Sequence, residues 1–314
     1  MKRGGGGVRV YISADMEGVT GLVDAEDVQL RGRDYERGRE MMTEDVNAAV
    51  RGALAAGATH VLVNDAHSSM RNLLADRVHP EAVLVRGMPK PMGMLQDLDA
   101  GFDAVLCVGF HSRAGTLGVL SHSYMGHEIE DMWLDDRPVG EIGFAHATAA
   151  ALGVPVVMLS GDDAACAEMA AWDDTVVTAP VKYALDRFAA RLRPVAEARK
   201  AIEEAAAEGV SRAAALARPA VGGADTDAGA GAGAGADAGA GAGADAGAGA
   251  GAGGMTLAVR WQSSSVASQL VGIPGVTLRD ARTVEVTGPA PQLFRLFGVF
   301  MRVASSVTGQ HPYC

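Results

Sequence analysis

The chain has 314 residues, 48% of them hydrophobic, which is enough to bury a large core and is more typical of two domains than of one. Its formal net charge of −11 argues against a nucleic-acid-binding protein, because phosphate contacts require clusters of Lys and Arg that the sequence lacks. No segment offers about 18 uninterrupted apolar residues, and the three Cys are widely spaced without a CxxC pair. We therefore expect no membrane partner, no nucleic-acid partner and a reducing, cytoplasmic location.

The first two thirds of the chain predict strands that alternate with helices. In chain order, the predicted elements are a strand at Val8–Ala14, a helix at Tyr35–Ala56, strands at Val61–Asn64, Ala82–Arg86 and Ala104–Val108, a polar strand or hairpin at Tyr124–Arg137, a helix at Glu141–Leu152, a strand at Val154–Leu159, a helix at Asp162–Trp172 and a strand at Asp174–Ala179. Such alternation is typical of a doubly wound, mostly parallel α/β sheet.

The rest of the chain predicts a second, smaller α+β domain. A long helical stretch is expected from about Tyr183 to Leu216, and Gly222–Gly254 consists almost entirely of Gly and Ala. That composition predicts a flexible insertion, with a partly ordered Ala-rich segment as the alternative. The further elements are a strand at Met255–Trp261, a helix around Ser265–Leu270, a strand near Arg282–Thr287 and an amphipathic helix at Pro291–Ser306. We assign residues 8–180 to an α/β domain, 181–221 to a helical segment, 255–314 to the smaller domain and 222–254 to the insertion.

Two carboxylates follow the first predicted strand. Asp15 and Glu17 come directly after Val8–Ala14, and residues i and i+2 of an extended chain point to the same side. Two like charges held so close are unfavourable unless a cation or a proton neutralises them. The pair is interpreted either as solvated turn acids or as metal ligands, and partners nearby favour the second.

Histidines supply such partners. His67 follows Val61–Asn64 and His111 follows Ala104–Phe110, and the carboxyl ends of parallel strands meet in one crevice. A neutral imidazole there can bind a metal while its other N–H donates to a neighbour. Either His alone is more often structural, but two at equivalent positions favour ligands. Glu141, at a predicted helix start, adds a carboxylate, with a first-turn acid stabilised by the helix dipole as the alternative.

Three carboxylates and two imidazoles exceed what one tetrahedral zinc needs and suit a two-metal site with one bridging carboxylate. Mixed nitrogen and oxygen donors without thiolate favour zinc, with manganese or cobalt as alternatives. Paired metals hydrolyse bonds by generating hydroxide and polarising a carbonyl or phosphoryl oxygen. The sequence therefore predicts that the α/β domain is a metal-binding hydrolase domain.

One further histidine, His122, lies between two serines. No GxSxG motif accompanies it. We interpret His122 as a catalytic acid/base or nucleophile in a metal-assisted reaction, with a structural role as the alternative.

Five motifs resemble those of the zinc-dependent D-aminopeptidases of the DppA type, which are self-compartmentalising peptidases. They are Ser13–Gly18, Val63–Ser68, Gly109–Ala114, Gly118–Ser123 and Arg137–Gly143, and Tyr35–Arg39, Met42–Glu44 and Ser160–Asp163 look similar too. The resemblance covers about residues 8–221 and 255–314 in the same order. The chain departs from the family pattern at Gly222–Gly254 and at Gly4–Gly7.

The resemblance implies a role for each matched residue. Asp15 matches the carboxylate that bridges two zinc ions, His122 matches the catalytic histidine, and the remaining zinc ligands are matched by Glu17, His67, His111 and Glu141. Family members release N-terminal D-amino acids from short peptides or amides and form a ring-stacked decamer with the sites in an inner chamber. The resemblance thus implies a dizinc aminopeptidase that is a homo-oligomer.

Two alternatives from other classes share this ligand set. A metal-dependent phosphoesterase could use the same donors on a phosphate ester. A non-catalytic peptide-binding protein linked to dipeptide uptake could keep the metal only for structure.

Overall fold

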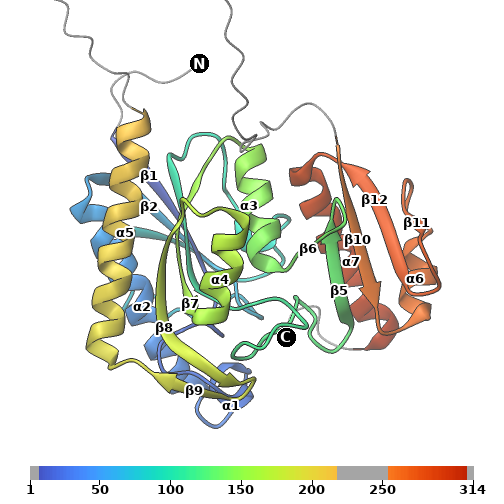
Figure 1. The fold of residues 1–314 in the computed structure, drawn as a ribbon, viewed down its shortest axis with the longest axis horizontal. Coiled ribbons are helices and arrows are strands. Elements are labelled where there is room, and N and C mark those ends of the chain that lie inside the picture. The colour runs from blue at the N-terminus through green and yellow to red at the C-terminus, as the bar shows by residue number, and fades with distance from the viewer. Residues whose placement is uncertain (1–6, 218–253, 310–314) are drawn as a thin grey trace, which may run out of the picture.

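Two β-sheets form the framework of the molecule (Figure 1). The computed structural model describes residues 7–217 and 254–309. The expected insertion therefore lies outside the described residues apart from Gly254, and so does most of the glycine-rich start. Within the described ranges, no helix has both the length and the apolar character that a membrane span requires.

The first sheet has seven strands. They are β1 (Val8–Ala14), β2 (Ala58–Asp65), β3 (Ala82–Val85), β4 (Ala104–Phe110), β7 (Val156–Asp162), β8 (Val177–Asp186) and β9 (Ala189–Leu192). Their order is β3-β2-β1-β4-β7-β8-β9, and all neighbours are parallel except β8 and β9. Every residue of β4 is buried, as expected for a central strand with both faces covered.

Helices cover both faces of this sheet (Figure 1). On one face lie α2 (Tyr35–Ala55) and α5 (Val195–Ala217), and on the other lie α3 (Glu141–Ala151) and α4 (Asp163–Trp172). Alternate residues of β1 enter the two cores: Ile12 packs with the residues of α2 and α5, and Tyr11 packs with the core that includes α3 and α4. The predicted doubly wound α/β sheet is thus confirmed.

The second sheet is smaller and antiparallel throughout. Its elements are β5 (Ile129–Leu134), β6 (Arg137–Pro138), β10 (Met255–Trp261), β11 (Thr277–Leu278), β12 (Thr283–Gly288), α6 (Ser264–Leu270) and α7 (Ala290–Thr308), and the strand order is β11-β12-β10-β5-β6. Helix α7 has Pro291 in its first turn, and Gly309, whose φ of 72° is left-handed, caps its C-terminal end. It also packs on α3, where the rings of Phe294 and Phe144 lie 4.8 Å apart. The two sheets therefore share a hydrophobic core.

One predicted element is wrong. The long helix expected from Tyr183 does not begin there, because β8 continues to Asp186 and turns into β9, which pairs with it. Helix α5 starts only at Val195, directly after Pro194. The pairing between the end of β8 and β9 overrides the helix propensity of this stretch, which contains Ala, Leu and Arg.

Other short elements lie between the predicted ones. A four-residue helix, α1 (Ala25–Val28), and a 3₁₀ turn, η1 (Gly93–Leu95), complete the fold. Strands β5 and β6 form the expected hairpin but pair within the second sheet, so the sheets are not divided at residue 180. The division into domains itself stays a prediction.

Candidate metal centre

The candidate site lies where the strand order of the first sheet reverses, between β1 and β4. In open α/β sheets this is where the loops after neighbouring strands separate and leave a crevice. Asp15 and Glu17 follow β1, His67 follows β2, and His111 follows β4. Glu141, the first residue of α3, faces them, and all of these side chains are buried around one cavity.

Two close glycines bring the ends of β1 and β4 together. The backbone amide of Gly18 donates to the carbonyl of Gly109 at 2.8 Å. A Cβ atom on Gly18 would lie 1.9 Å from the carbonyl oxygen of Phe110, so no larger residue fits there. Gly109 has a φ of +74°, and a Cβ on it would lie 2.3 Å from the carbonyl oxygen of Asp15. The glycines thus permit the short distance between the Asp15 and His111 segments.

The first group of donors comprises Asp15, Glu17 and His67. The Nδ1 atom of His67 lies 3.4 Å from Oδ1 of Asp15 and 3.1 Å from Oε2 of Glu17. Its Nε2 atom lies 2.9 Å from the carbonyl oxygen of Val28 and donates to it. That bond fixes the ring so that Nδ1 offers its lone pair to the side of the two carboxylates, as in metal-binding histidines.

The second group comprises Asp15, His111 and Glu141. The Nε2 atom of His111 lies 3.6 Å from Oδ2 of Asp15 and 3.3 Å from Oε1 of Glu141. Its Nδ1 atom lies 3.0 Å from the carbonyl oxygen of Ser112, which accepts the N–H and leaves Nε2 free. Asp15 thus turns one oxygen to each group, as a bridging carboxylate would.

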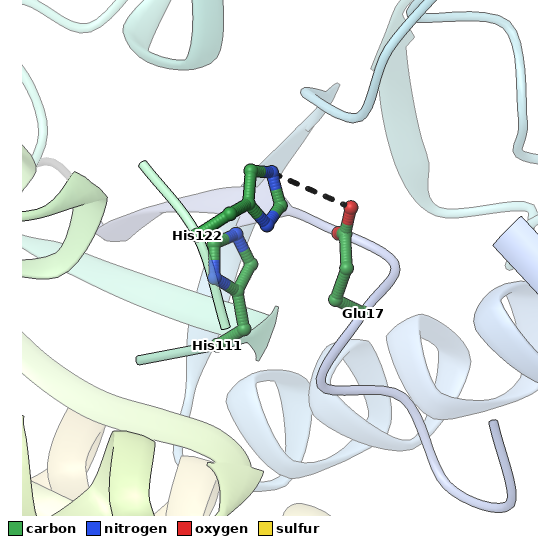
Figure 2. Close-up of side chains that lie close together, drawn as sticks. All are labelled: Glu17, His111 and His122. Atoms are coloured by element: carbon green, nitrogen blue, oxygen red, sulfur yellow. Dashed lines mark ion pairs between the residues drawn. The ribbon is translucent and has the colours of Figure 1, made fainter. Parts of the chain in front are cut away.

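His122 lies beside Glu17 of the first group and His111 of the second (Figure 2). Its ring stacks on that of His111, with centroids 4.2 Å apart and planes 9° from parallel. Nδ1 lies 2.9 Å from the carbonyl oxygen of Leu120, and Nε2 lies 3.9 Å from Oε1 of Glu17 and 4.0 Å from Oε1 of Glu141. Glu17, His111 and His122 form a third possible donor group. His122 therefore borders the candidate centre with one nitrogen while the other is held by the backbone.

The loop that carries His122 is fixed from three sides. The amide of Val119 donates to Oδ2 of the buried Asp162 at 2.7 Å, and the amide of Leu120 donates to the carbonyl of Arg187 in the β8–β9 turn at 2.7 Å. The amide of Tyr124 donates to Oε1 of Glu141 at 2.7 Å. Asp162 belongs to a motif noted in the sequence, but its contact with this loop could not be foreseen.

The electrostatics of the cluster fit a cation. Burial, followed by the charge of Glu17, raises the pKa of Asp15 to about 7. Burial alone would raise the pKa of Glu17, but His67 holds it well below its usual range. Burial opposes protonation of His67 and His111, yet Glu17 and Glu141, respectively, raise their pKa values well above the usual range. Without a metal, the cluster is thus neutralised by protons.

Two buried carboxylate oxygens in the cluster make no hydrogen bond of suitable geometry within the described residues. They are Oδ2 of Asp15 and Oε2 of Glu17, and each faces a histidine nitrogen. Buried carboxylate oxygens are normally satisfied by donors or by a metal. Two carboxylate oxygens and two imidazoles, each with its other ring nitrogen beside a backbone carbonyl, are a donor set that zinc accepts once the rings lose their extra protons. The residues present therefore fit the predicted cofactor.

An apolar wall completes the cavity. Helix α7 contributes Phe294, Phe297 and Met301, and Met70 and Met94 line it as well. The sequence predicts α7 as an amphipathic helix but gives no sign that its apolar face borders the site. The cavity is thus polar at the ends of β1, β2 and β4 and apolar along α7 and at Met70 and Met94.

Comparisons with known proteins agree with this geometry. Residues 8–225 match a family model described as D-aminopeptidase. A D-aminopeptidase of Bacillus subtilis (strain 168) is 43% identical over 197 residues, which are 63% of this chain and 72% of that protein. The solved structure of a Zn-dependent D-aminopeptidase, DppA from Bacillus subtilis, described as a self-compartmentalizing protease, matches with a TM-score of 0.80 at 31% identity. That match covers 96% of this chain and 99% of the other.

Proposed function

Because this chain belongs to the D-aminopeptidase family, we propose that it hydrolyses the bond after the N-terminal D-amino acid of short peptides or amides, with two zinc ions bound in the buried cluster. The single observation that carries the proposal is the arrangement around Asp15. Its two carboxylate oxygens face two separate groups of donors, each with one histidine and one glutamate. The phosphoesterase and the non-catalytic alternatives are not favoured, since the relatives described above are D-aminopeptidases.

The two groups would hold one ion each. Asp15, Glu17 and His67 would hold the first, and Asp15, His111 and Glu141 the second. When bound, zinc lowers the pKa of a coordinated water and polarises the scissile carbonyl. The protein supplies the fixed donors and keeps the surroundings dry, since Asp15 and Glu17 are each only 3% exposed.

His122 would transfer the proton. Burial, followed by the neighbouring His111, lowers the pKa of His122, so the ring is neutral at neutral pH. Because Nδ1–H donates to the carbonyl of Leu120, Nε2 carries the free lone pair. It would accept a proton from the attacking water and return it to the leaving amine. The alternative, direct attack by Nε2 on the carbonyl carbon, uses the same free lone pair.

The two walls of the cavity suit the two parts of an N-terminal residue. The α-amino end would lie on the polar side of the cavity, beside the candidate metal centre. The side chain would pack against the apolar wall, in which Phe297 and Met301 are almost completely buried. This division would favour small or apolar N-terminal residues.

The test combines metal analysis with a substrate panel. We expect purified protein to contain two equivalents of zinc and to hydrolyse D-aminoacyl amides faster than their L-enantiomers. Phosphate monoesters and diesters should not be hydrolysed. Zinc-replete protein that binds D-aminoacyl peptides without turnover, or that hydrolyses only phosphate esters, would contradict the proposal.

We further propose that the chain forms a closed homo-oligomer, a decamer by its resemblance to the family, and acts in the cytoplasm. The DppA relative is described as self-compartmentalizing. Apolar side chains near the β8–β9 turn are free to be covered by another copy: Leu117, Leu185 and Phe188 are 68%, 66% and 50% exposed. Light scattering coupled to size exclusion tests the assembly, and a monomer at micromolar concentration would contradict it. Cell fractionation tests the location.

A further inference from the structure

A fully buried lysine lies behind the candidate metal centre. Lys182, in β8, has no exposed surface, and its Nζ donates to the carbonyl oxygens of Glu17 at 2.5 Å, Val19 at 3.0 Å and Leu22 at 2.6 Å. All three carbonyls belong to the loop that follows β1, which we call the ligand loop (residues 15–22). The lysine and the loop are more than 150 residues apart in sequence.

The three bonds use all the hydrogen-bonding capacity of the ammonium group. Lysine has three N–H donors, and three carbonyls receive them. A buried ammonium group is strongly unfavourable without such partners. Conversely, three carbonyls that converge on one point have dipoles that repel one another unless a cation lies between them. The course of the ligand loop and the charge of Lys182 therefore depend on each other.

A buried carboxylate holds the same loop by an amide. Oδ2 of Asp45, in α2, accepts the amide of Thr20 at 2.8 Å, and Asp45 is 1% exposed. Oδ1 of Asp45 lies 3.4 Å from Nε of Arg199, in α5. The ligand loop is thus fixed through its carbonyls by a cation and through an amide by an anion.

Glu17 belongs both to the ligand loop that Lys182 holds and to the candidate metal centre. Its carbonyl is bound by Lys182, while its side chain lies 3.1 Å from His67 and 3.9 Å from His122. Glu17 lies in a loop rather than in a strand. The backbone hydrogen bond to the sheet that lies nearest to Glu17 is the one from the amide of Gly18 to the carbonyl of Gly109. The bond from Lys182 therefore fixes the backbone from which the Glu17 side chain projects.

We propose that Lys182 is a positioning residue of the metal centre: by binding three carbonyls of the ligand loop, it holds Glu17 in place for the ion that Glu17 would share with Asp15 and His67. The proposal deepens the proposed function and rests on it. Lys182 touches neither substrate nor reacting atoms in this scheme. It acts through the backbone of Glu17.

The experiment compares Lys182→Met with a matched core variant, Val181→Ala. Val181 is the preceding residue of β8, is also fully buried, and belongs to the core formed with α2 and α5. Both variants should be less stable than the wild type, but only Lys182→Met removes the ammonium group. Lys182→Arg, which keeps the charge and several donors, is the conservative variant. If Lys182→Met is insoluble, Lys182→Gln replaces it, since it keeps two N–H donors on a neutral side chain.

The first readout is hydrogen exchange in the metal-free protein. The amides of Gly18, Val19, Thr20 and Leu22 all have acceptors, so they report on the ligand loop. We expect Lys182→Met to speed their exchange at least tenfold more than that of β4, Val181→Ala to change both regions equally, and Lys182→Arg to restore part of the protection. A folded Lys182→Met protein with wild-type exchange in residues 18–22 would overturn the proposal.

The second readout is zinc affinity, measured by competition with a chromophoric chelator. We expect Lys182→Met to lower the affinity for one of the two zinc ions by about 10- to 100-fold, as removal of a hydrogen-bond partner behind a metal ligand does. Val181→Ala should lower the affinity for neither ion. Faster loop exchange with unchanged affinity for both ions would overturn the proposal, because the loop would then not govern the centre. If the wild type binds no zinc, the proposed function fails, and the exchange data still show whether Lys182 holds the loop.

Discussion

Replacing Asp15 by alanine should empty both metal positions, whereas replacing any ligand of a single group should empty one. Oδ1 of Asp15 lies 3.4 Å from His67 and Oδ2 lies 3.6 Å from His111, so the carboxylate belongs to both donor groups. His67→Ala removes a donor from only one of the two groups that contain Asp15. The contrast between these variants follows from geometry alone.

The size of the expected loss of zinc affinity follows from the direct contact that the Asp15 carboxylate would make with each ion. Removing a hydrogen-bond partner behind a metal ligand weakens binding about 10- to 100-fold. Asp15 would contact each ion directly, so we expect Asp15→Ala to lower the affinity for each ion by at least about 100-fold, which is about 2.8 kcal/mol of binding free energy per ion. Because burial and Glu17 already raise the pKa of Asp15 to about 7, its charge is poorly stabilised in the metal-free state. The Asp15→Ala protein should therefore still fold.

The assay is zinc content after dialysis against a buffered free-zinc concentration, with thermal unfolding as a check on the fold. Wild type should hold two equivalents, His67→Ala one, and Asp15→Ala less than one half. Two equivalents in Asp15→Ala would refute a shared carboxylate. Loss of both ions in His67→Ala would refute two separate donor groups.

Three further outcomes are expected. His122→Ala should keep both zinc ions and lose about 10²- to 10⁴-fold in kcat; full kcat would remove His122 from the mechanism. In the metal-free protein Glu17 and Glu141 raise the pKa values of His67 and His111 well above the usual range. The stability that these carboxylate–histidine pairs contribute is therefore present at acidic pH and is lost as the pH rises through the raised pKa values of His67 and His111. Zinc must displace these protons, so its apparent affinity should rise with pH and calorimetry should show proton release; heats independent of the buffer would contradict this. Gly18→Ala should destabilise the protein by about 1–3 kcal/mol or more, since its Cβ would overlap a β4 carbonyl, whereas a Cβ on Gly298 would meet nothing closer than 3.7 Å and Gly298→Ala should not destabilise.

The strands that deliver the site could be predicted because their signals are local. Val8–Ala14 is a strand with the predicted bounds, and the apolar runs before His67 and His111 are both buried strands. Parallel strands place their following loops at one edge, so polar residues after separate strands indicate a common site. The structure brings all six candidate residues together around one cavity. Their individual roles stay predictions.

The rest depends on contacts between distant segments. Between Tyr183 and Leu192 the composition favours a helix, and only the pairing of the end of β8 with β9 makes it a hairpin. Pro194 marks the true start of α5, and it could have been used as a signal. Lys182 gives no such signal, because a single lysine in a strand does not reveal that its partners lie in the loop after β1. The same holds for the apolar face of α7.

The contribution of α7 to the cavity has a consequence for the order in which the enzyme is made. A ribosome synthesises every candidate ligand, from Asp15 to Glu141, long before it reaches Phe294 and Met301. The polar donors and the α7 side of the cavity therefore come from parts of the chain that are synthesised at different times. Because α7 packs on α3, whose first residue is Glu141, the cavity is complete only once this late helix is in place.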